Sequence, residues 1–294
     1  MSHALTFTLP SVVASGFLLD LADSTEPWRP TFEAAKVDVF ALKADPKAFL
    51  EAGKALDNYI RNKVISLGGV ELVKKTALAA VYAGVALPLT IYNTTTLVLD
   101  SDFTRCRVRC LRFLRVSPLT SAIPRQDKAK KAGIMLAEIL EKQLQGKRPA
   151  VLIGYGPGAT MILHCLLELH RRELGSLVYS ATLISLPDSP SPVTWSAARS
   201  VVAHELVNCY SRNDWVLSLN SRLYTLNHRV GGLRAVEVEG VRDVNCSDLI
   251  EGHLDIRHKV SEVLARVKSG EEPQESFDTA ALEEKAEQLK LSER

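Results

Sequence analysis

The sequence predicts an α/β fold, in which a mostly parallel sheet carries helices on both of its faces. Short apolar runs of strand length alternate along the chain with longer segments of helical periodicity. Most of these runs are apolar throughout, which is typical of parallel strands that are buried on both faces. A length of 294 residues without internal repeats suits one large domain of this kind.

The N-terminal part predicts two strands followed by an apolar helical region. Residues 11–18 form the first expected strand, which ends in a glycine turn, and residues 37–42 form the second. Residues 46–63 have helical spacing. The apolar block that follows is interrupted by glycine and proline and is too short between charges for a simple membrane span. We therefore expect residues 64–123 to form a helical insertion, or lid, on the domain.

The C-terminal half alternates between strands and helices. Strands are expected over residues 150–153, 178–186, 205–210 and 235–241, the last with the alternation of an exposed edge strand. Helices are expected over residues 129–145, 161–170, 195–202, 215–226 and 256–267. The segment 269–294 is rich in glutamate and predicts an acidic tail, disordered or weakly helical, outside the domain of residues 1–268.

A glycine turn after the strand at 150–153 is the most informative feature of the chain. It reads Gly154-Tyr-Gly156-Pro-Gly158 and leads directly into a helical pattern. In α/β-hydrolases this strand-turn-helix position holds the nucleophile elbow, with the motif G-x-S-x-G. The outer two glycines are in place, but glycine occupies position 156, where the motif has serine. The turn therefore predicts a nucleophile elbow without its nucleophile.

Further segments, in the same order, resemble the α/β-hydrolase-like family typified by transmembrane and coiled-coil domain-containing protein 4, which is domain of unknown function 726. The resemblance covers residues 11–267. It is carried by residues 15–18, 27–28, 38–42, 72–92, 154–159, 208–217, 230–232 and 245–253. It implies an α/β-hydrolase-like fold and a lipase-like ancestry, with the apolar helices packed over the site or against a membrane.

The resemblance also implies positions for a catalytic triad in the chain order Ser, Asp, His. The acid falls on Asp214, the base on His253 and the nucleophile on Gly156, while the oxyanion donors fall on Phe17 and Pro157. Glycine has no hydroxyl, and proline has no N–H to donate. Loss of the serine alone costs about a million-fold in turnover, and loss of an oxyanion donor about a hundredfold or more. We therefore expect a pseudoenzyme that binds or scaffolds.

A lipase or esterase with an atypical nucleophile is a second interpretation. Thr160 and Cys165 carry a hydroxyl and a thiol, but both lie a turn or more inside the helix that follows the elbow. His253 could instead activate water directly. Asp214 has a purely structural alternative, because the sequence Ser-Arg-Asn-Asp suits the N-cap of the helix that begins after it.

Dinucleotide binding is a third interpretation. Gly154, Gly156 and Ala159 satisfy the Rossmann fingerprint G-x-G-x-x-G/A between a strand and a helix. The fingerprint also requires an acidic residue about 20 residues further on, at the end of the next strand. That strand is expected to end at Leu186, and Asp188 lies beyond it, after a proline. The motif alone is therefore weak.

An arginine-rich stretch next to the apolar block suggests a membrane surface. It alternates with apolar residues and contains Arg105, Arg107, Arg109, Arg112 and Arg115. Such a basic amphipathic segment binds anionic lipid, although arginine stems that cover apolar surface on a solvated helix would look the same. We expect a membrane lipid or a protein as partner. Nucleic acid is not expected, because the net charge is only +2 and no recognition motif is present.

The cysteines and the N-terminus indicate the compartment. Five scattered cysteines form no metal-binding spacing, so we expect no metal and no cofactor, and thiols that stay reduced. The N-terminal apolar run lacks the preceding basic segment of a signal peptide. We therefore expect a cytoplasmic protein that associates with membrane, peripherally or integrally, through residues 64–115.

Overall fold

The strands of the computed structural model form one sheet at the centre of the molecule. The model describes residues 9–16, 18–32, 38–43, 46–47, 50–51, 53–54, 57, 123–214, 216–218, 229–250, 252 and 255–270. Within these residues the strands are β1 (Ser11–Ala14), β2 (Val39–Ala41), β3 (Ala150–Tyr155), β4 (Val178–Ile184), β5 (Leu206–Tyr210) and β6 (Val241–Asn245). They form a six-stranded sheet in the order β2-β1-β3-β4-β5-β6, and every pairing is parallel. The predicted parallel sheet is confirmed.

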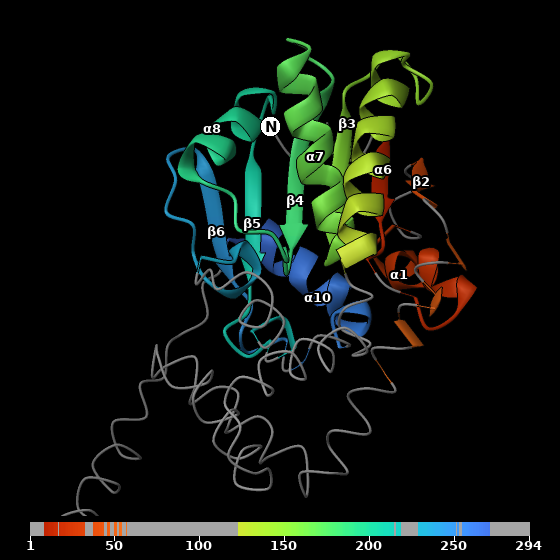
Figure 1. Ribbon diagram of the computed structural model, residues 1–294, viewed down its shortest axis with the longest axis vertical. Coiled ribbons are helices and arrows are strands. Elements are labelled where there is room, and N and C mark those ends of the chain that lie inside the picture. The colour runs from red at the N-terminus through yellow and green to blue at the C-terminus, as the bar shows by residue number, and fades with distance from the viewer. Residues whose placement is uncertain are drawn as a thin grey trace, which may run out of the picture.

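Helices cover both faces of this sheet (Figure 1). One face carries α6 (Ile123–Glu141), α7 (Pro157–Arg171) and α8 (Pro192–Ser200), with α7 packed against both α6 and α8. The other face carries α10 (Ile256–Ser269), which contacts the short helix α1 (Arg29–Phe32) and the 3-10 turn Glu26–Trp28 that precedes it. The α/β fold with helices on both faces is therefore confirmed.

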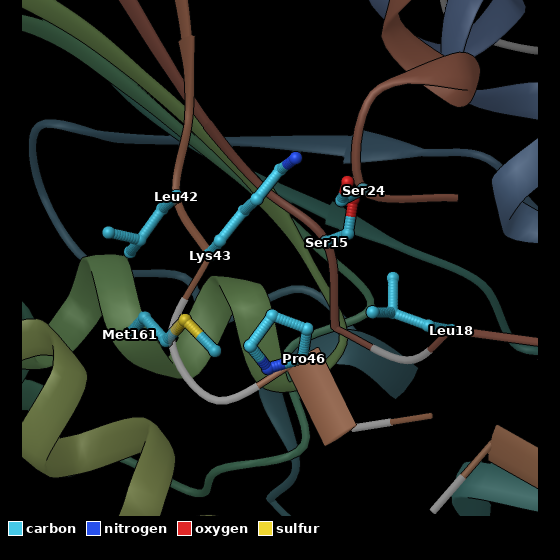
Figure 2. Close-up of a pocket in the computed structure, with 7 residues that line it drawn as sticks. All are labelled: Ser15, Leu18, Ser24, Leu42, Lys43, Pro46 and Met161. Atoms are coloured by element: carbon cyan, nitrogen blue, oxygen red, sulfur yellow. The ribbon is translucent and has the colours of Figure 1, made fainter. Parts of the chain in front are cut away.

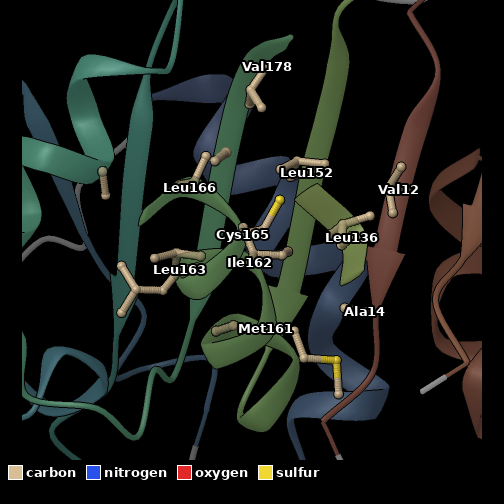
Figure 3. Packing of buried hydrophobic residues seen from close by; sticks show 14 of the residues in the cluster. Val12, Ala14, Leu136, Leu152, Met161, Ile162, Leu163, Cys165, Leu166 and Val178 are labelled. Atoms are coloured by element: carbon tan, nitrogen blue, oxygen red, sulfur yellow. The ribbon is translucent and has the colours of Figure 1, made fainter. Parts of the chain in front are cut away.

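Two hydrophobic clusters fill the space between sheet and helices. Successive strand residues point to opposite faces, so Val12 and Leu152 join the cluster under α7, whereas Val13 and Ile153 join the cluster under α10. Figure 3 shows side chains of α7, among them Ile162, lying over β1, β3 and β4. Burial on both faces explains why the strands are apolar throughout. Each such side chain contributes roughly 1.5–3 kcal/mol of transfer free energy.

The strand order places a topological switch point between β1 and β3. From β1 the chain moves outward to β2 and then returns to β3 on the other side of β1. The segments that follow β1 and β3 therefore leave the carboxyl edge of the sheet in opposite directions. In open α/β sheets, ligands bind in the crevice at such a topological switch point. The turn after β3 lies at this point.

Glycines allow the chain to close tightly around the β3–α7 turn. A Cβ at Gly158 would clash with the backbone carbonyl of Ala14 on β1. A Cβ at Gly154 would lie 2.6 Å from the carbonyl oxygen of Gly158, and one at Gly16 would lie 2.6 Å from Cδ of Pro157. Real Cβ atoms essentially never approach this closely. The turn, the start of α7 and the end of β1 are therefore in direct backbone contact.

The predicted edge strand over residues 235–241 is wrong, because the strand β6 begins where that prediction ends. The carboxylate of Asp243 accepts hydrogen bonds from the backbone N–H of Val236, at 3.0 and 3.1 Å, and of Glu237, at 3.0 Å. Glu237 and Gly240 have positive φ angles of 54° and 79°. Both features make this segment a turn. Val236 and Val238 are both partly buried against the core, with Glu237 between them. This gives the segment the alternating pattern of an edge strand.

Other boundaries differ less. Helix α6 begins at Ile123 rather than at residue 129, and α8 begins at Pro192, where the Ser191 hydroxyl caps it by accepting from the N–H of Thr194. Apart from its last residue, the expected lid over residues 64–123 lies outside the described residues. So does the acidic tail beyond Gly270.

The contact between α7 and β1 leads to a prediction. Gly158→Ala should lower the free energy of unfolding by roughly 1–3 kcal/mol, because its Cβ meets backbone that cannot move aside. Gly175→Ala is the matched control, because a Cβ there would meet only the Ser200 carbonyl, at 4.0 Å. The control should change stability by no more than about 1 kcal/mol. Urea-induced unfolding measures both, and equal effects would contradict the close contact.

Candidate active site

The elbow after β3 keeps the backbone conformation of a nucleophile turn. Gly156 has φ 54° and ψ −129° and stands between the last residue of β3 and the first of α7. Its N–H donates to the carbonyl of Ile184 on β4 at 2.9 Å, and its own carbonyl accepts from Ala159 at 2.9 Å. A positive φ costs a residue with a side chain roughly 1–3 kcal/mol, whereas glycine adopts it freely. The turn therefore keeps its geometry with little strain.

Pro157 is the first residue of α7, directly after the turn. Proline suits this first helical position, where its fixed φ matches the helix and its missing N–H breaks no helical hydrogen bond. The same missing N–H removes the donor that the residue after a hydrolase nucleophile supplies to an oxyanion. The second expected donor, Phe17, lies outside the described residues. Its neighbour Gly16 lies directly against Pro157.

Asp214 lies at the same edge of the sheet, just beyond β5. Its side chain is fully buried, and its Oδ1 accepts the backbone N–H of Leu217 at 2.9 Å. The N–H of Ser218 donates to the Asp214 carbonyl at 3.0 Å. Asp214 therefore caps the helical turn at residues 216–218, as the structural alternative predicts. β4 separates β5 from β3, so the two strand ends are about 10 Å apart across the sheet.

The base position, His253, lies outside the described residues. The segment leading to it is nevertheless joined to the segment leading to Asp214. The Ser211 hydroxyl donates to the Ile250 carbonyl at 2.8 Å, and the Asn213 amide donates to the Ser247 carbonyl at 2.7 Å. The acid loop and the chain before the base position thus form one connected unit.

A buried hydrogen-bond network lies behind the elbow, on the α10 side of the sheet. The Ser15 hydroxyl accepts from the Trp28 indole N–H at 3.0 Å and donates to the Asp23 carbonyl at 3.0 Å. The ring of Tyr155, the residue before the elbow glycine, lies 5.6 Å from the Trp28 ring between centroids. The two bonds of the Ser15 hydroxyl use its one donor site and one of its two acceptor sites.

Two charged side chains, Asp23 and Arg257, link the loop that holds this network to α10. The Asp23 carboxylate accepts from the backbone N–H groups of Leu19, at 2.7 Å, and Asp20, at 3.0 Å. It also pairs with the Arg257 guanidinium at 3.2 Å, near the start of α10. Burial raises the pKa of the Tyr155 hydroxyl well above its usual value, so this tyrosine stays protonated. The loop after β1, the elbow strand and α10 are therefore connected.

Ser185 is a candidate that the sequence did not single out. It follows β4 directly and has a positive φ of 48°, which is strained for a residue with a side chain. Its side chain is fully buried, and among the described residues its hydroxyl has no hydrogen-bond partner. Its N–H donates to the Cys209 carbonyl at 2.9 Å. Ser185 thus lies one strand away from the elbow, in a strained conformation. In the sequence it looks like any serine at the end of a strand.

The alternative nucleophiles named from the sequence are both fully buried in α7. Thr160 and Cys165 have no exposed surface, and Cys165 belongs to the core cluster under α7. Burial raises the pKa of the Cys165 thiol, so the thiol form is favoured over the reactive thiolate. On the next helical turn from Thr160, burial lowers the pKa of His164. These positions therefore look structural rather than catalytic.

A small hollow opens beside β1 and α7 (Figure 2). The space that it encloses is only about 10 Å³, room for about one water molecule. Its lining is apolar with two hydroxyls and one amine: Ser15, Leu18, Ser24, Leu42, Lys43, Pro46 and Met161. Ligand sites usually range from about 300 to 1,000 Å³. The hollow is therefore far too small to be a ligand site by itself.

The next two findings, on metal-binding groups and on membrane-spanning helices, concern the described residues. Those residues contain no group of three or more His, Cys, Asp or Glu side chains arranged to hold a metal ion. Within the same segments, every helix falls short of the length or the apolarity that crossing a bilayer demands. The five arginines Arg105, Arg107, Arg109, Arg112 and Arg115 lie outside them.

The network around Ser15 gives a prediction about stability. Ser15→Ala removes the buried acceptor of the Trp28 indole, so the free energy of unfolding should fall by roughly 2–3 kcal/mol. Thr25→Ala is the control, because its hydroxyl makes one exposed 3.3 Å bond to the Ala22 carbonyl. Its effect should stay within about 0.5 kcal/mol. Chemical denaturation monitored by Trp fluorescence measures both, and a Ser15→Ala protein as stable as wild type would refute the network.

The chain is similar in sequence to several known proteins. The chain is 31% identical over 262 residues to the transmembrane and coiled-coil domain-containing protein STS1 of Oryza sativa, covering 87% of this chain and 36% of that protein. It is 28% identical over 232 residues to the uncharacterized membrane protein F35D11.3 of Caenorhabditis elegans, covering 78% of this chain and 34% of the relative. It is 24% identical over 263 residues to the probable lipase MIL1 of Saccharomyces cerevisiae, covering 87% and 22% respectively.

The chain thus spans little more than a third of these relatives at most. No solved structure matches it. The family described as protein of unknown function DUF726 matches residues 6–113 and 123–270, which are most of the chain. This family match agrees with the resemblance seen in the sequence: the chain belongs to the DUF726 family.

Proposed function

We propose that this protein is a catalytically inactive α/β-hydrolase-like protein that binds or scaffolds at a membrane surface. The observation that carries the proposal is the elbow, where Gly156 and Pro157 stand in the conformation of a nucleophile turn. Two independent parts of the chemistry are missing there, the attacking hydroxyl and one oxyanion N–H. The probable lipase among the relatives supports descent from an enzyme of lipid chemistry.

Binding at the carboxyl edge remains available without catalysis. The β1–β3 switch point is a property of the fold and does not need the serine, and ligands of open α/β sheets bind at such points. The hollow beside β1 has apolar walls and the exposed amine of Lys43 at its rim, but it encloses only about 10 Å³. The ligand class is therefore proposed from the arginine-rich stretch and the relatives, not from this hollow.

The first test restores the missing chemistry. Wild-type protein should not react with a fluorophosphonate probe, because no hydroxyl stands at the elbow. Gly156→Ser with Pro157→Ala restores both the hydroxyl and the N–H, and this double variant should be labelled at residue 156. The single variant Gly156→Ser should react about a hundredfold more slowly, because it still lacks one oxyanion donor. Mass spectrometry of the labelled peptide identifies the residue.

Two further variants control this test. In the double variant, His253→Ala should abolish labelling. Asp214→Asn should abolish it too, yet leave the unfolding midpoint nearly unchanged, because asparagine caps a helix about as well as aspartate. Turnover of p-nitrophenyl esters by the wild-type protein, with loss of that activity in His253→Ala, would refute the inactive-scaffold proposal.

Membrane association is proposed from the arginine-rich stretch and from the relatives named as membrane proteins. The protein should sediment with vesicles containing anionic phosphatidylserine and not with neutral phosphatidylcholine vesicles. Replacing Arg105 and Arg107 by glutamine should weaken binding roughly 10- to 30-fold, since each arginine near the surface contributes about 1 kcal/mol. Lys142 and Lys147 are exposed between α6 and β3 and serve as controls. Equal binding to both kinds of vesicle would contradict an electrostatic contact.

Ser185 supports a second candidate function, a serine hydrolase with an atypical nucleophile. Its strained backbone and its buried hydroxyl without a partner among the described residues are typical of functional positions. The fluorophosphonate experiment separates the two candidates. Labelling of the wild-type protein at Ser185, lost in Ser185→Ala, would favour the hydrolase.

Dinucleotide binding gains no support from the fold. The Rossmann fingerprint belongs to the turn after the first strand, whereas here the glycines follow β3. The next strand, β4, ends at Ile184 and is followed by Ser185, where the fingerprint needs an acid. Asp188 lies further on, in the loop before α8.

A further inference from the structure

Basic residues continue from the arginine-rich stretch directly into α6. Between residues 105 and 131 the sequence has nine Lys and Arg residues and a single acidic residue, Asp127. The described part of this run is the first half of α6, where Lys128 and Lys131 are exposed and Lys130 is half-buried. The helix itself packs against α7 through a buried apolar face. The basic run therefore ends on an element whose place in the fold is fixed.

The direction of α6 places its lysines at the carboxyl edge of the sheet. A Cβ at Gly133 would lie 2.3 Å from the carbonyl oxygen of Met161, and Glu141 pairs with Arg172 at 2.5 Å. The two helices therefore run parallel and side by side (Figure 1). α7 begins four residues before Met161, whereas α6 begins ten residues before Gly133. At about 1.5 Å per residue, α6 starts roughly 9 Å further out than α7, and Lys128 is about level with the elbow turn.

Lysines of a second segment lie at the same corner of the sheet. Lys43 is exposed after β2, and it lines the hollow together with Ser24 and with Met161, the residue on which Gly133 packs (Figure 2). The described residues between 43 and 57 carry three lysines and two carboxylates, Lys43, Lys47, Lys54, Glu51 and Asp57. These neighbours therefore do not reverse the positive charge of the α6 surface.

Positive charge at the far ends of the same two helices is balanced within the protein. Arg171 pairs with Glu168 at 2.6 Å. Arg172 pairs with three carboxylates, those of Glu138, Glu141 and Glu168. The first half of α6 has only Asp127 as an acidic residue of its own. The two ends of the α6–α7 pair therefore differ in charge, and the end beside the elbow is the basic one.

We propose that the carboxyl edge of the sheet, with the first half of α6 on it, is the face that lies on an anionic bilayer. The inference rests on the proposed membrane association and adds its orientation. The described chain stops at Asp57 and resumes at Ile123, and the arginine-rich stretch belongs to the sequence between them. Gly53 packs directly against Leu18, just beyond β1, and Ile123 is the outer end of α6, so both chain ends lie at this edge.

Charge complementarity identifies the partner. Lysines close to an anionic membrane surface each contribute about 1 kcal/mol of binding free energy. The arginine-rich stretch and the α6 lysines are continuous in sequence, so a bilayer that attracts the first also attracts the second. In this orientation the elbow turn and the β1–β3 switch point face the lipid.

Vesicle binding of the full chain tests the α6 surface. Lys128→Gln combined with Lys131→Gln should weaken binding to phosphatidylcholine vesicles that contain phosphatidylserine, by roughly 10- to 30-fold. Lys142→Gln combined with Lys147→Gln is the matched control, because both lysines are exposed beyond the other end of α6. This control should keep its affinity within about twofold. Since all four side chains are exposed, both proteins should unfold at the wild-type midpoint.

Lipid quenching tests the orientation. A fluorophore is attached to Leu21→Cys or to Leu144→Cys, in a background where Cys106 and Cys110 are serine and the other three cysteines are buried. Leu21 follows β1 at the carboxyl edge and is 54% exposed, whereas Leu144 follows the end of α6 and is 70% exposed. Nitroxide-labelled lipid in the same vesicles should quench the label at position 21 several-fold more strongly than the label at position 144.

The outcomes separate this inference from the proposed membrane association. Wild-type protein that ignores phosphatidylserine vesicles would overturn both. Binding that falls when Arg105 and Arg107 are replaced, but is unchanged in the Lys128 and Lys131 variant, would overturn the orientation alone. Quenching at position 144 that equals or exceeds quenching at position 21 would also overturn it, because the opposite end of the domain would then be as close to the lipid.

Discussion

Backbone contact between β1 and the β3–α7 turn is the constraint on which the rest of this structure depends. Gly158 lies directly against Ala14, and Gly16 lies against Pro157, at distances that leave no room for a Cβ. This contact sets the direction in which α7 leaves the sheet. α7 in turn supplies the central layer of one core cluster, packed against both α6 and α8. The glycines around the elbow are therefore required by the fold itself, whatever chemistry the site has.

That constraint separates the shape of the site from its chemistry. The positive φ at Gly156 and the proline at the first position of α7 both favour the sharp turn. An elbow of this kind keeps its place when its hydroxyl is absent, because the hydroxyl contributes nothing to the turn. On the α10 side of the sheet, Trp28 bonds the Ser15 hydroxyl and packs against the ring of Tyr155, the residue before the turn. The relatives of this chain include a probable lipase and proteins whose names mention only a membrane.

Local patterns in the sequence predicted what local interactions determine. The apolar strands, the elbow glycines and the cap at Asp214 were predicted because each depends on residues a few positions apart. The valine alternation before β6 misled the prediction, since a side chain further along, Asp243, folds that segment into a turn. The Ser15 network and the strained Ser185 have no such signal. The Ser15 hydroxyl bonds residues 8 and 13 positions further along the chain, in the loop that follows β1, and the strain at Ser185 lies in its backbone.

The contacts of the loop after β1 with α10 have a consequence for synthesis on the ribosome. Asp23 pairs with Arg257, and the Thr31 hydroxyl bonds that of Ser261, each across more than 200 residues of sequence. β1 itself also waits for β3. The beginning of the chain therefore cannot reach its native contacts until nearly all of the domain has left the exit tunnel. Such non-local contacts slow folding and leave apolar strands exposed meanwhile, so the nascent chain should depend on chaperones.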